Sequence, residues 1–182
     1  MKIYSTRHGQ TDYNKNDLIL GTTDMELNET GLAQAAELAE KIRSSEDIKI
    51  DIIISSPMKR ARKTAEIVAA ANGLEIVTDE RLREWDYGRY EGMHRTAEGF
   101  HENKLEFGVK MGETGESLLE LAHRVYSAID DIKGSYSGMN VLLVSHGGIC
   151  RVIETYFNRM TAEQFSNWFM GNCQLLEYNT GE

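Results

Sequence analysis

Two strand-like segments of the chain each end in a histidine that is followed by glycine. Residues 1–6 lead into Arg7-His8-Gly9, and residues 140–144 lead into Ser145-His146-Gly147-Gly148. Short apolar runs that stop at polar or glycine residues are typical of buried strands. In an open α/β sheet, ligands bind at the carboxyl ends of the strands. We therefore expect a sheet in which both histidines lie at the same edge and share one pocket.

The rest of the chain alternates between strand-like and helical patterns. Strands are expected over residues 51–55, 74–78 and 174–178, and helices over 27–44, 57–71 and 116–133, with a further helix from His146 to about residue 157 and a short one over 161–169. Residues 86–112 show no clear period and predict a loop-rich, functional excursion. Alternating strands and helices, without a repeat or a linker, indicate one α/β domain over residues 1–182.

Local signals define the ends of two of these helices. Asn28 is suited to cap the helix over residues 27–44, and Gly31 weakens its first turn slightly. Asn72-Gly73 is a stop signal for the helix over residues 57–71. The buried face of the helix over residues 27–44 is expected to hold Leu32, Ala35, Ala36, Ala39 and Ile42.

Composition excludes several classes of protein. The chain has 20 basic and 29 acidic residues, a net charge of −9, whereas nucleic acids and anionic membranes select basic surfaces. No apolar run approaches the roughly 20 residues of a membrane helix, and the N-terminus shows no leader, so we expect a cytoplasmic protein. Cys150 and Cys173 are too few for a disulfide framework. Cys150 lies near an expected helix start, which could lower the pKa of its thiol.

The segment Arg7-His8-Gly9-Gln10-Thr11, followed by Asn14, resembles the signature of the histidine phosphatase superfamily, which includes the phosphoglycerate mutases. The resemblance continues, in the family's order, through residues 21–31, 55–61, 82–84, 115–117 and 145–148. It implies a phosphoglycerate mutase-like fold: a three-layer α/β/α sandwich with a mostly parallel sheet. It also implies phosphoryl chemistry at a histidine, with no cofactor and no metal.

Five residues form the candidate catalytic set. His8 is the expected nucleophile, because a neutral imidazole nitrogen can attack phosphorus and form a phosphohistidine. Arg7 and Arg60 are expected to clamp the phosphate, since a guanidinium matches phosphate oxygens and stays charged. As in the family's pattern, His146 is expected to donate a hydrogen bond to the phosphoryl group. Glu84 is expected to protonate the leaving oxygen and then to activate water.

Asp86 and Glu91 compete with Glu84 for the acid role. Gly9 is expected to leave room for substrate and to bring its amide toward a phosphate. His94, His101 and His123 are placed outside the site, although His94 and His101 could touch a leaving group. None of the three shows zinc spacing with the cysteines. Turn geometry could equally explain each residue of the candidate substrate-binding set. This set comprises Asn14, Thr23, Thr11 and Gly21, which resemble family positions, and Gly147.

The leading functional interpretation is a phosphomonoesterase that acts on a small phosphorylated metabolite through a phosphohistidine. The first alternative is an isomerase of the cofactor-dependent phosphoglycerate mutase type, and the second is a non-catalytic binder of phosphate ligands. Residues 85–92 resemble the phosphatase branch, and the stretch between Glu84 and His146 is short for such a mutase. A binder has no need of a proton carrier. Cysteine-phosphatase, Asp-x-Asp and Gly-Lys-Ser/Thr motifs do not occur.

The partner expected from this interpretation is a small phosphate ester, without nucleic acid or membrane. Which ester it is, and whether the chain forms a homo-oligomer, stay open at this point. Phosphoserine, phosphoglycerates, sugar phosphates and ribazole phosphate all suit the resemblance. Aromatic side chains of the excursion are the candidate walls of the leaving-group pocket: Trp85, Tyr87, Tyr90, Phe100 and Phe107.

Overall fold

A five-stranded sheet forms the centre of the protein in the computed structural model, which describes residues 1–181. The strands lie in the order β3-β2-β4-β1-β5. Four of them run parallel, and β5 pairs with β1 in the antiparallel direction. Their bounds are Lys2–Arg7 (β1), Ile52–Ser55 (β2), Glu75–Thr78 (β3), Val141–Ser145 (β4) and Leu175–Asn179 (β5).

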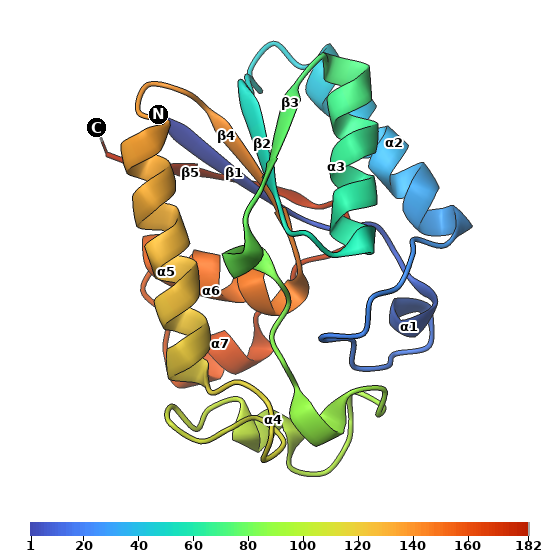
Figure 1. Cartoon of the computed structure of the whole chain (residues 1–182), viewed down its shortest axis with the longest axis vertical. Helices are drawn as coiled ribbons and strands as arrows, with labels where there is room; N and C mark the ends of the chain where they lie inside the picture. The colour runs from blue at the N-terminus through green and yellow to red at the C-terminus, as the bar shows by residue number, and fades with distance from the viewer. Residues whose placement is uncertain (182) are drawn as a thin grey trace.

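Helices cover both faces of this sheet (Figure 1). On one face, α2 (Glu29–Ser44) and α3 (Lys59–Asn72) pack on inward-facing residues such as Ile53 and Leu142. On the other face, α5 (Leu118–Ser135) and α6 (Gly147–Phe157) pack on Ile54, Leu143 and their neighbours. Side chains of successive strand residues thus point to opposite faces of the sheet and pack in two different cores. The three-layer sandwich with a mostly parallel sheet is confirmed, and the expected elements begin and end within two residues of the observed ones.

Three of the five residues expected on the buried face of α2 are buried: Ala35, Ala39 and Ile42. Leu32 is 39% exposed and Ala36 is exposed as well, whereas Gly31 and Leu38 are buried instead. Gly31 is buried because the first turn of the helix lies against the loop after β1. A Cβ on Gly31 would lie only 2.1 Å from the carbonyl oxygen of Gln10. Asn28 caps α2 by accepting a hydrogen bond from the amide of Gly31 at 2.9 Å, as expected.

Residues 86–112 form the loop-rich excursion that the sequence predicts. They contain only two short helices among the described residues, η2 (Gly88–Tyr90) and α4 (Phe100–Asn103), and η1 (Glu80–Leu82) precedes them. Tyr87, Tyr90 and Phe100 belong to the same core cluster as α5, α6 and the sheet. The excursion therefore packs on the same core as the sheet. The remaining short helices are α1 (Asp12–Lys15) and α7 (Ala162–Asn167).

Candidate active site

The two histidines meet because β1 and β4 are parallel neighbours. Arg7 lies opposite Ser145 in the sheet register. The amide of His8 continues this pairing and donates a hydrogen bond to the carbonyl oxygen of Ser145 at 3.0 Å. The imidazole rings of His8 and His146 then lie 5.2 Å apart, centroid to centroid, in an edge-on arrangement. The strand-end pattern in the sequence is sufficient to predict this pairing.

The buried ring of His8 has a defined tautomer in its neutral form. Its Nδ1 lies 2.7 Å from the carbonyl oxygen of Gly9 and therefore carries the proton that it donates. The lone pair is then left on Nε2, where Nε of Arg60 donates a hydrogen bond at 3.2 Å. Burial, followed by the charges of Arg60 and Arg7, lowers the pKa of His8 well below its ordinary value of 6.5. His8 is therefore a neutral imidazole, protonated on Nδ1 and with its lone pair on Nε2.

Arg60 contacts both histidines from the protein interior and does not line the cavity that His8 faces. It comes from the first turn of α3 and is fully buried. Its Nε donates to His8 and also to Nδ1 of His146 at 3.1 Å, while Nη1 and Nη2 donate to the carbonyl oxygens of Thr23 and Gly21, each at 2.8 Å. The guanidinium of Arg60, the expected phosphate clamp, is thus hydrogen-bonded to protein groups through all three of its nitrogens.

His146 is fixed from both sides. Its Nδ1 accepts from Arg60, so its proton lies on Nε2, which donates to Oγ of Ser56 at 2.7 Å. Burial and the charge of Arg60 lower its pKa well below 6.5. Like Arg60, His146 lies behind the cavity wall.

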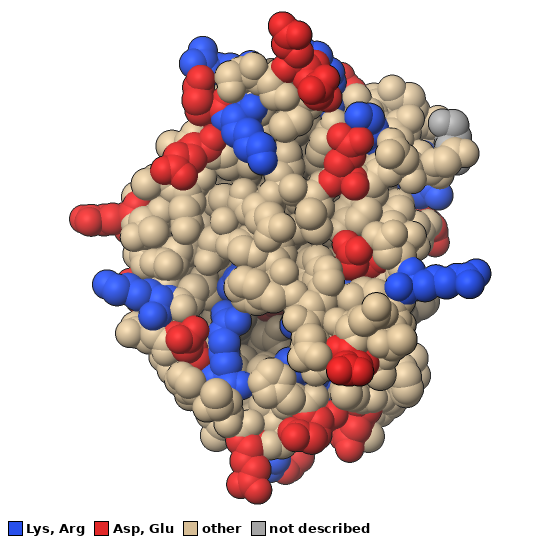
Figure 2. All heavy atoms as spheres, turned by 180° about the vertical axis from the view of Figure 1, so that it is seen from behind, with Lys and Arg blue, Asp and Glu red and all other residues tan. Residues whose placement is uncertain are grey.

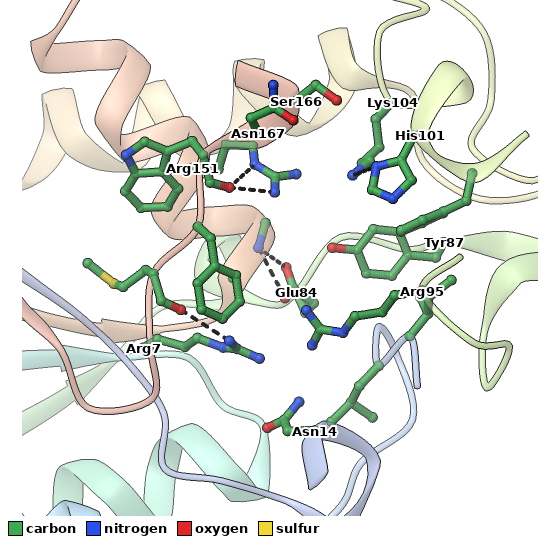
Figure 3. A pocket seen from close by; sticks show the side chains of 18 of the residues that line it. Arg7, Asn14, Glu84, Tyr87, Arg95, His101, Lys104, Arg151, Ser166 and Asn167 are labelled. Atoms are coloured by element: carbon green, nitrogen blue, oxygen red, sulfur yellow. Dashed lines mark hydrogen bonds between the residues drawn. The ribbon is translucent and has the colours of Figure 1, made fainter. Parts of the chain in front are cut away.

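A cavity of about 240 Å³ opens in front of His8. Figure 2 shows a hollow on the surface with Lys and Arg side chains inside it and along one edge, and Figure 3 shows the cavity from close by. Of the candidate residues, the structure brings five to its wall: His8, Arg7, Asn14, Glu84 and Gly147.

Arg7 and Asn14 both present free donors at this cavity. Nη1 of Arg7 donates to the carbonyl oxygen of Met170 at 3.1 Å, while its buried Nε has no partner among the described residues. The Oδ1 of Asn14 accepts from the amide of Thr11 and from Nδ2 of Asn172. This pattern leaves the Nδ2 group of Asn14 available to a ligand. Both side chains can therefore bind an anion beside His8.

The carboxyl group of Glu84 is held at the start of α6. Glu84 is 6% exposed, and its oxygens accept hydrogen bonds from the amides of Trp85 at 2.9 Å and Gly148 at 3.1 and 3.2 Å. Glycine at position 148 allows this approach, because a Cβ there would lie 2.6 Å from Oε1 of Glu84 and would displace the carboxyl group. A Cβ on Gly147 would lie 3.6 Å from Nε of Arg7 and 3.9 Å from Oε2 of Glu84. Gly147 thus lies between the side chains of Arg7 and Glu84.

Several candidates have structural positions instead. Thr11, Gly21 and Thr23 do not line the cavity. Thr11 caps α1 through its side chain. The amides of Gly21 and Thr23 donate to the carboxylate of Glu91, and their carbonyl groups hold Arg60. Glu91 is therefore a positioning residue.

Asp86 and Gly9 also differ from their expected positions. Oδ1 of Asp86 accepts from the amide of Gly88, and Asp86 lies outside the cavity that His8 lines. The amide of Gly9 donates to Oγ1 of Thr64, so it does not face a ligand. Glycine is required at this position for another reason, because a Cβ would lie 2.3 Å from the carbonyl oxygen of Gly31.

Sequence reasoning missed most of the basic wall of the cavity. Arg95, Lys104 and Arg151 line it, and so does His101, for which the sequence left contact with a leaving group open. Of the expected aromatic walls, only Tyr87 and Phe100 line it. Arg151 gives a usable signal, since it follows Gly147 by four residues and so shares its helix face. Arg95 and Lys104 lie in the aperiodic excursion, where the sequence has no such signal.

Two further expectations concern the cysteines and metals. Burial raises the pKa of the Cys150 thiol to about 11, so the expected lowering by the helix start is wrong. Within residues 1–181, no three His, Cys, Asp or Glu side chains are grouped so that they could hold a metal ion. No helix in the same range has the length and hydropathy of a membrane span.

The chain belongs to branch 1 of the histidine phosphatase superfamily, whose family model matches residues 3–182. A protein of Hydrogenobacter thermophilus with the provisional name phosphoserine phosphatase 2 is 36% identical over 97% of this chain and 88% of its own length. Phosphoglycerate mutase-like protein 4 of Arabidopsis thaliana is 36% identical over 82% of this chain and 68% of its own.

Solved structures show the same fold. A mycobacterial glucosyl-3-phosphoglycerate phosphatase superposes with a TM-score of 0.84 at 27% identity, covering 97% of this chain and 90% of its own. Phosphoserine phosphatase of Entamoeba histolytica, solved with 3-phosphoglyceric acid, also has a TM-score of 0.84 at 27% identity and covers 97% of this chain and 89% of its own.

Proposed function

We propose that the protein is a phosphomonoesterase that hydrolyses a small phosphorylated metabolite through a phosphohistidine on His8. One observation carries this proposal: the unprotonated Nε2 of His8 lies at a cavity that Arg7 and Glu84 also line. A nucleophile, a cation for the phosphate and a proton carrier are the three groups that the reaction needs. Membership of the family and the names of its phosphatase relatives support the same activity.

In the first step, Nε2 of His8 attacks phosphorus and the bond to the ester oxygen breaks. Glu84 gives its proton to the departing oxygen, so the leaving group departs as an alcohol. Arg7 and Asn14 bind the phosphoryl oxygens, whose charge rises in the transition state. The N–H of Arg60 that faces Nε2 in the free enzyme becomes available to a phosphoryl oxygen when the nitrogen bonds to phosphorus.

In the second step, water attacks the phosphohistidine and the carboxylate of Glu84 takes its proton. The N–P bond breaks, which releases phosphate and restores neutral His8 and protonated Glu84. The enzyme is regenerated without a cofactor. A mutase would instead return the phosphoryl group to a second hydroxyl of the substrate, so product analysis separates these two activities.

The test is direct detection of the phosphoenzyme. Wild-type protein and the His8→Ala variant are mixed with p-nitrophenyl phosphate, quenched and analysed by mass spectrometry. We expect one acid-labile phosphoryl group on the wild type only, together with loss of p-nitrophenol release by His8→Ala. The matched control is His123→Ala, which removes an exposed histidine of α5 and should retain both signals. Normal turnover by His8→Ala would exclude the mechanism.

A further inference from the structure

Four cations surround one carboxyl group in the cavity. Arg7, Arg95, Lys104 and Arg151 line it, and Glu84 is its only acidic lining residue in the described chain. None of the four makes an ion pair within residues 1–181, although ion pairs are frequent elsewhere on the protein. The overall charge of −9 makes this local excess of positive charge more notable. Unpaired cations at a concave wall are an arrangement that selects anions.

The cations form two groups on either side of Glu84. In Figure 3, Arg7 and Arg95 point into one part of the cavity, and Arg151 and Lys104 face each other in the other part. The pKa shifts agree with this division. After burial, Arg95 is the main cause that lowers the pKa of Arg7 to about 10, and Arg151 is the main charge that lowers the pKa of Lys104 to about 7. A single phosphoryl group beside His8 would offset the positive charge of Arg7 and Arg95 only.

Lys104 is the most exceptional member of the second group. It is 3% exposed, its Nζ lies 4.7 Å from the centre of the Phe100 ring, and it donates a hydrogen bond to Nδ1 of His101 at 3.0 Å. No carboxylate neutralises it within the described chain. Arg151 uses Nε and Nη2 to donate to the carbonyl oxygen of Trp168, at 3.2 and 2.8 Å. A buried, unpaired ammonium group is costly, and an incoming anion would offset that cost.

We propose that the leaving group of the substrate carries an anion of its own, which binds between Lys104 and Arg151. This inference rests on the proposed function, because it places the phosphoryl group beside His8 and Arg7. The cavity volume of about 240 Å³ suits a compact molecule. A phosphorylated short hydroxy acid, or a small bisphosphate, has two anionic groups in such a volume. Phosphate esters of uncharged sugars and alcohols lack the second anionic group.

Matched substrates test the inference on the wild-type enzyme. In 3-phosphoglycerate, a carboxylate occupies the position that a hydroxymethyl group has in the corresponding glycerol phosphate. We expect kcat/KM to be higher for 3-phosphoglycerate by about tenfold or more, the worth of one charge-assisted contact. Glycerol 1,3-bisphosphate is the second probe that carries an additional anionic group. Whichever of these two esters is turned over faster identifies the second anion as carboxylate or phosphate.

Variants of Lys104 test the location. Lys104→Met should reduce the ratio of the two kcat/KM values toward one, mainly by raising KM for 3-phosphoglycerate, whereas Lys104→Arg should retain most of the ratio. The matched control is Arg43→Met, which removes an exposed arginine of α2 that is paired with Glu40. Its ratio should equal that of the wild type. Thermal melting of each variant shows whether it is folded, and if Lys104→Met is not folded, the wild-type ratio decides.

The outcomes also separate this inference from the proposed function. Turnover of p-nitrophenyl phosphate through His8, with a wild-type ratio near one, would overturn the inference and leave the phosphatase activity intact. A high ratio that Lys104→Met does not change would overturn the assignment to Lys104 and Arg151. If no ester is hydrolysed, including p-nitrophenyl phosphate, the proposed function itself is wrong and the inference falls with it.

Discussion

The Nε of Arg60 lies 3.2 Å from the Nε2 of His8 and donates a hydrogen bond to it from within the protein core. A fixed cation at this position opposes protonation of the nitrogen that must attack phosphorus. It also orients the ring, because Nδ1 is fixed at the same time by the carbonyl oxygen of Gly9. Nε2 of His8 is thus kept unprotonated and its ring oriented before substrate binds.

Replacing Arg60 with methionine should raise the pKa of His8. Burial, the largest cause of the low pKa, would remain, so we expect a partial return toward 6.5. The imidazole 15N shifts of His8, followed by NMR from pH 5 to 8, measure this directly. His8 should stay neutral over most of that range in the wild type and gain a proton at its acid end in Arg60→Met. Arg62→Met is the control, because Arg62 lies in the same helix but is half-buried and paired with Glu66 instead of a histidine. An unchanged His8 titration in Arg60→Met would contradict the electrostatic role.

Glu84→Gln should show a defect that depends on the leaving group. The amide keeps the hydrogen-bond acceptor oxygen but cannot donate the carboxyl proton, so alkyl phosphates should lose most. p-Nitrophenolate needs little protonation, and the defect should shrink on its ester. Arg7→Met should lose roughly a hundredfold on both esters, because it removes transition-state charge stabilisation. Steady-state rates of both variants on an alkyl and an aryl phosphate provide the comparison. A selective alkyl defect in Asp86→Asn, and none in Glu84→Gln, would reassign the acid.

The layout of the fold and the two histidines could be predicted because their signals are local. Alternating apolar runs define the strands, and a histidine after each of two strands requires only that β1 and β4 be parallel neighbours. The end of α3 is equally local, since Gly73 adopts φ 66°, the left-handed conformation that favours glycine.

The errors arise where tertiary contacts determine which residues are buried and how their pKa values shift. Periodicity alone places Leu32 on the buried face of α2, but Gly31 packs against Gln10 and Leu32 is exposed. Cys150 lies at a helix start, yet burial determines its pKa. Lys104 belongs to a segment without a period, and only the packing of the excursion brings it to the cavity. Asn172, which holds the carbonyl oxygen of His8, has no signal in the sequence at all.

Two glycine-to-alanine substitutions in helices should have opposite effects on stability. Gly31→Ala would place a Cβ 2.1 Å from the backbone of Gln10, and relieving this overlap should cost about 1–3 kcal/mol in the free energy of unfolding. Gly134 has open space around its Cβ position near the end of α5, and Gly134→Ala should stabilise by roughly 0.5 kcal/mol. Denaturant unfolding measures both values. Equal destabilisation by the two changes would show that the close approach at Gly31 is not the cause.

We expect catalysis without a metal ion. Arg7 and the buried Arg60 provide the positive charge that a divalent cation provides in many phosphoryl-transfer enzymes. Release of p-nitrophenol should therefore survive prolonged incubation with excess EDTA and dialysis. Loss of activity that zinc or magnesium restores would contradict this expectation, and His94 and His101 would then become the first candidate ligands to test by substitution.

The preference for a substrate with a second anionic group should fall as pH rises through about 7. Burial, and then the charge of Arg151, lowers the pKa of Lys104 to about 7, so its ammonium group is present below this pH and lost above it. kcat/KM reports the free enzyme, and the phosphate group titrates in both 3-phosphoglycerate and its glycerol phosphate counterpart. The ratio of the two kcat/KM values between pH 6 and 9 therefore isolates Lys104. Lys104→Arg is the control, because arginine stays charged and its ratio should be flat. A wild-type ratio that is equally flat would show that Lys104 does not bind the second anion through its charge.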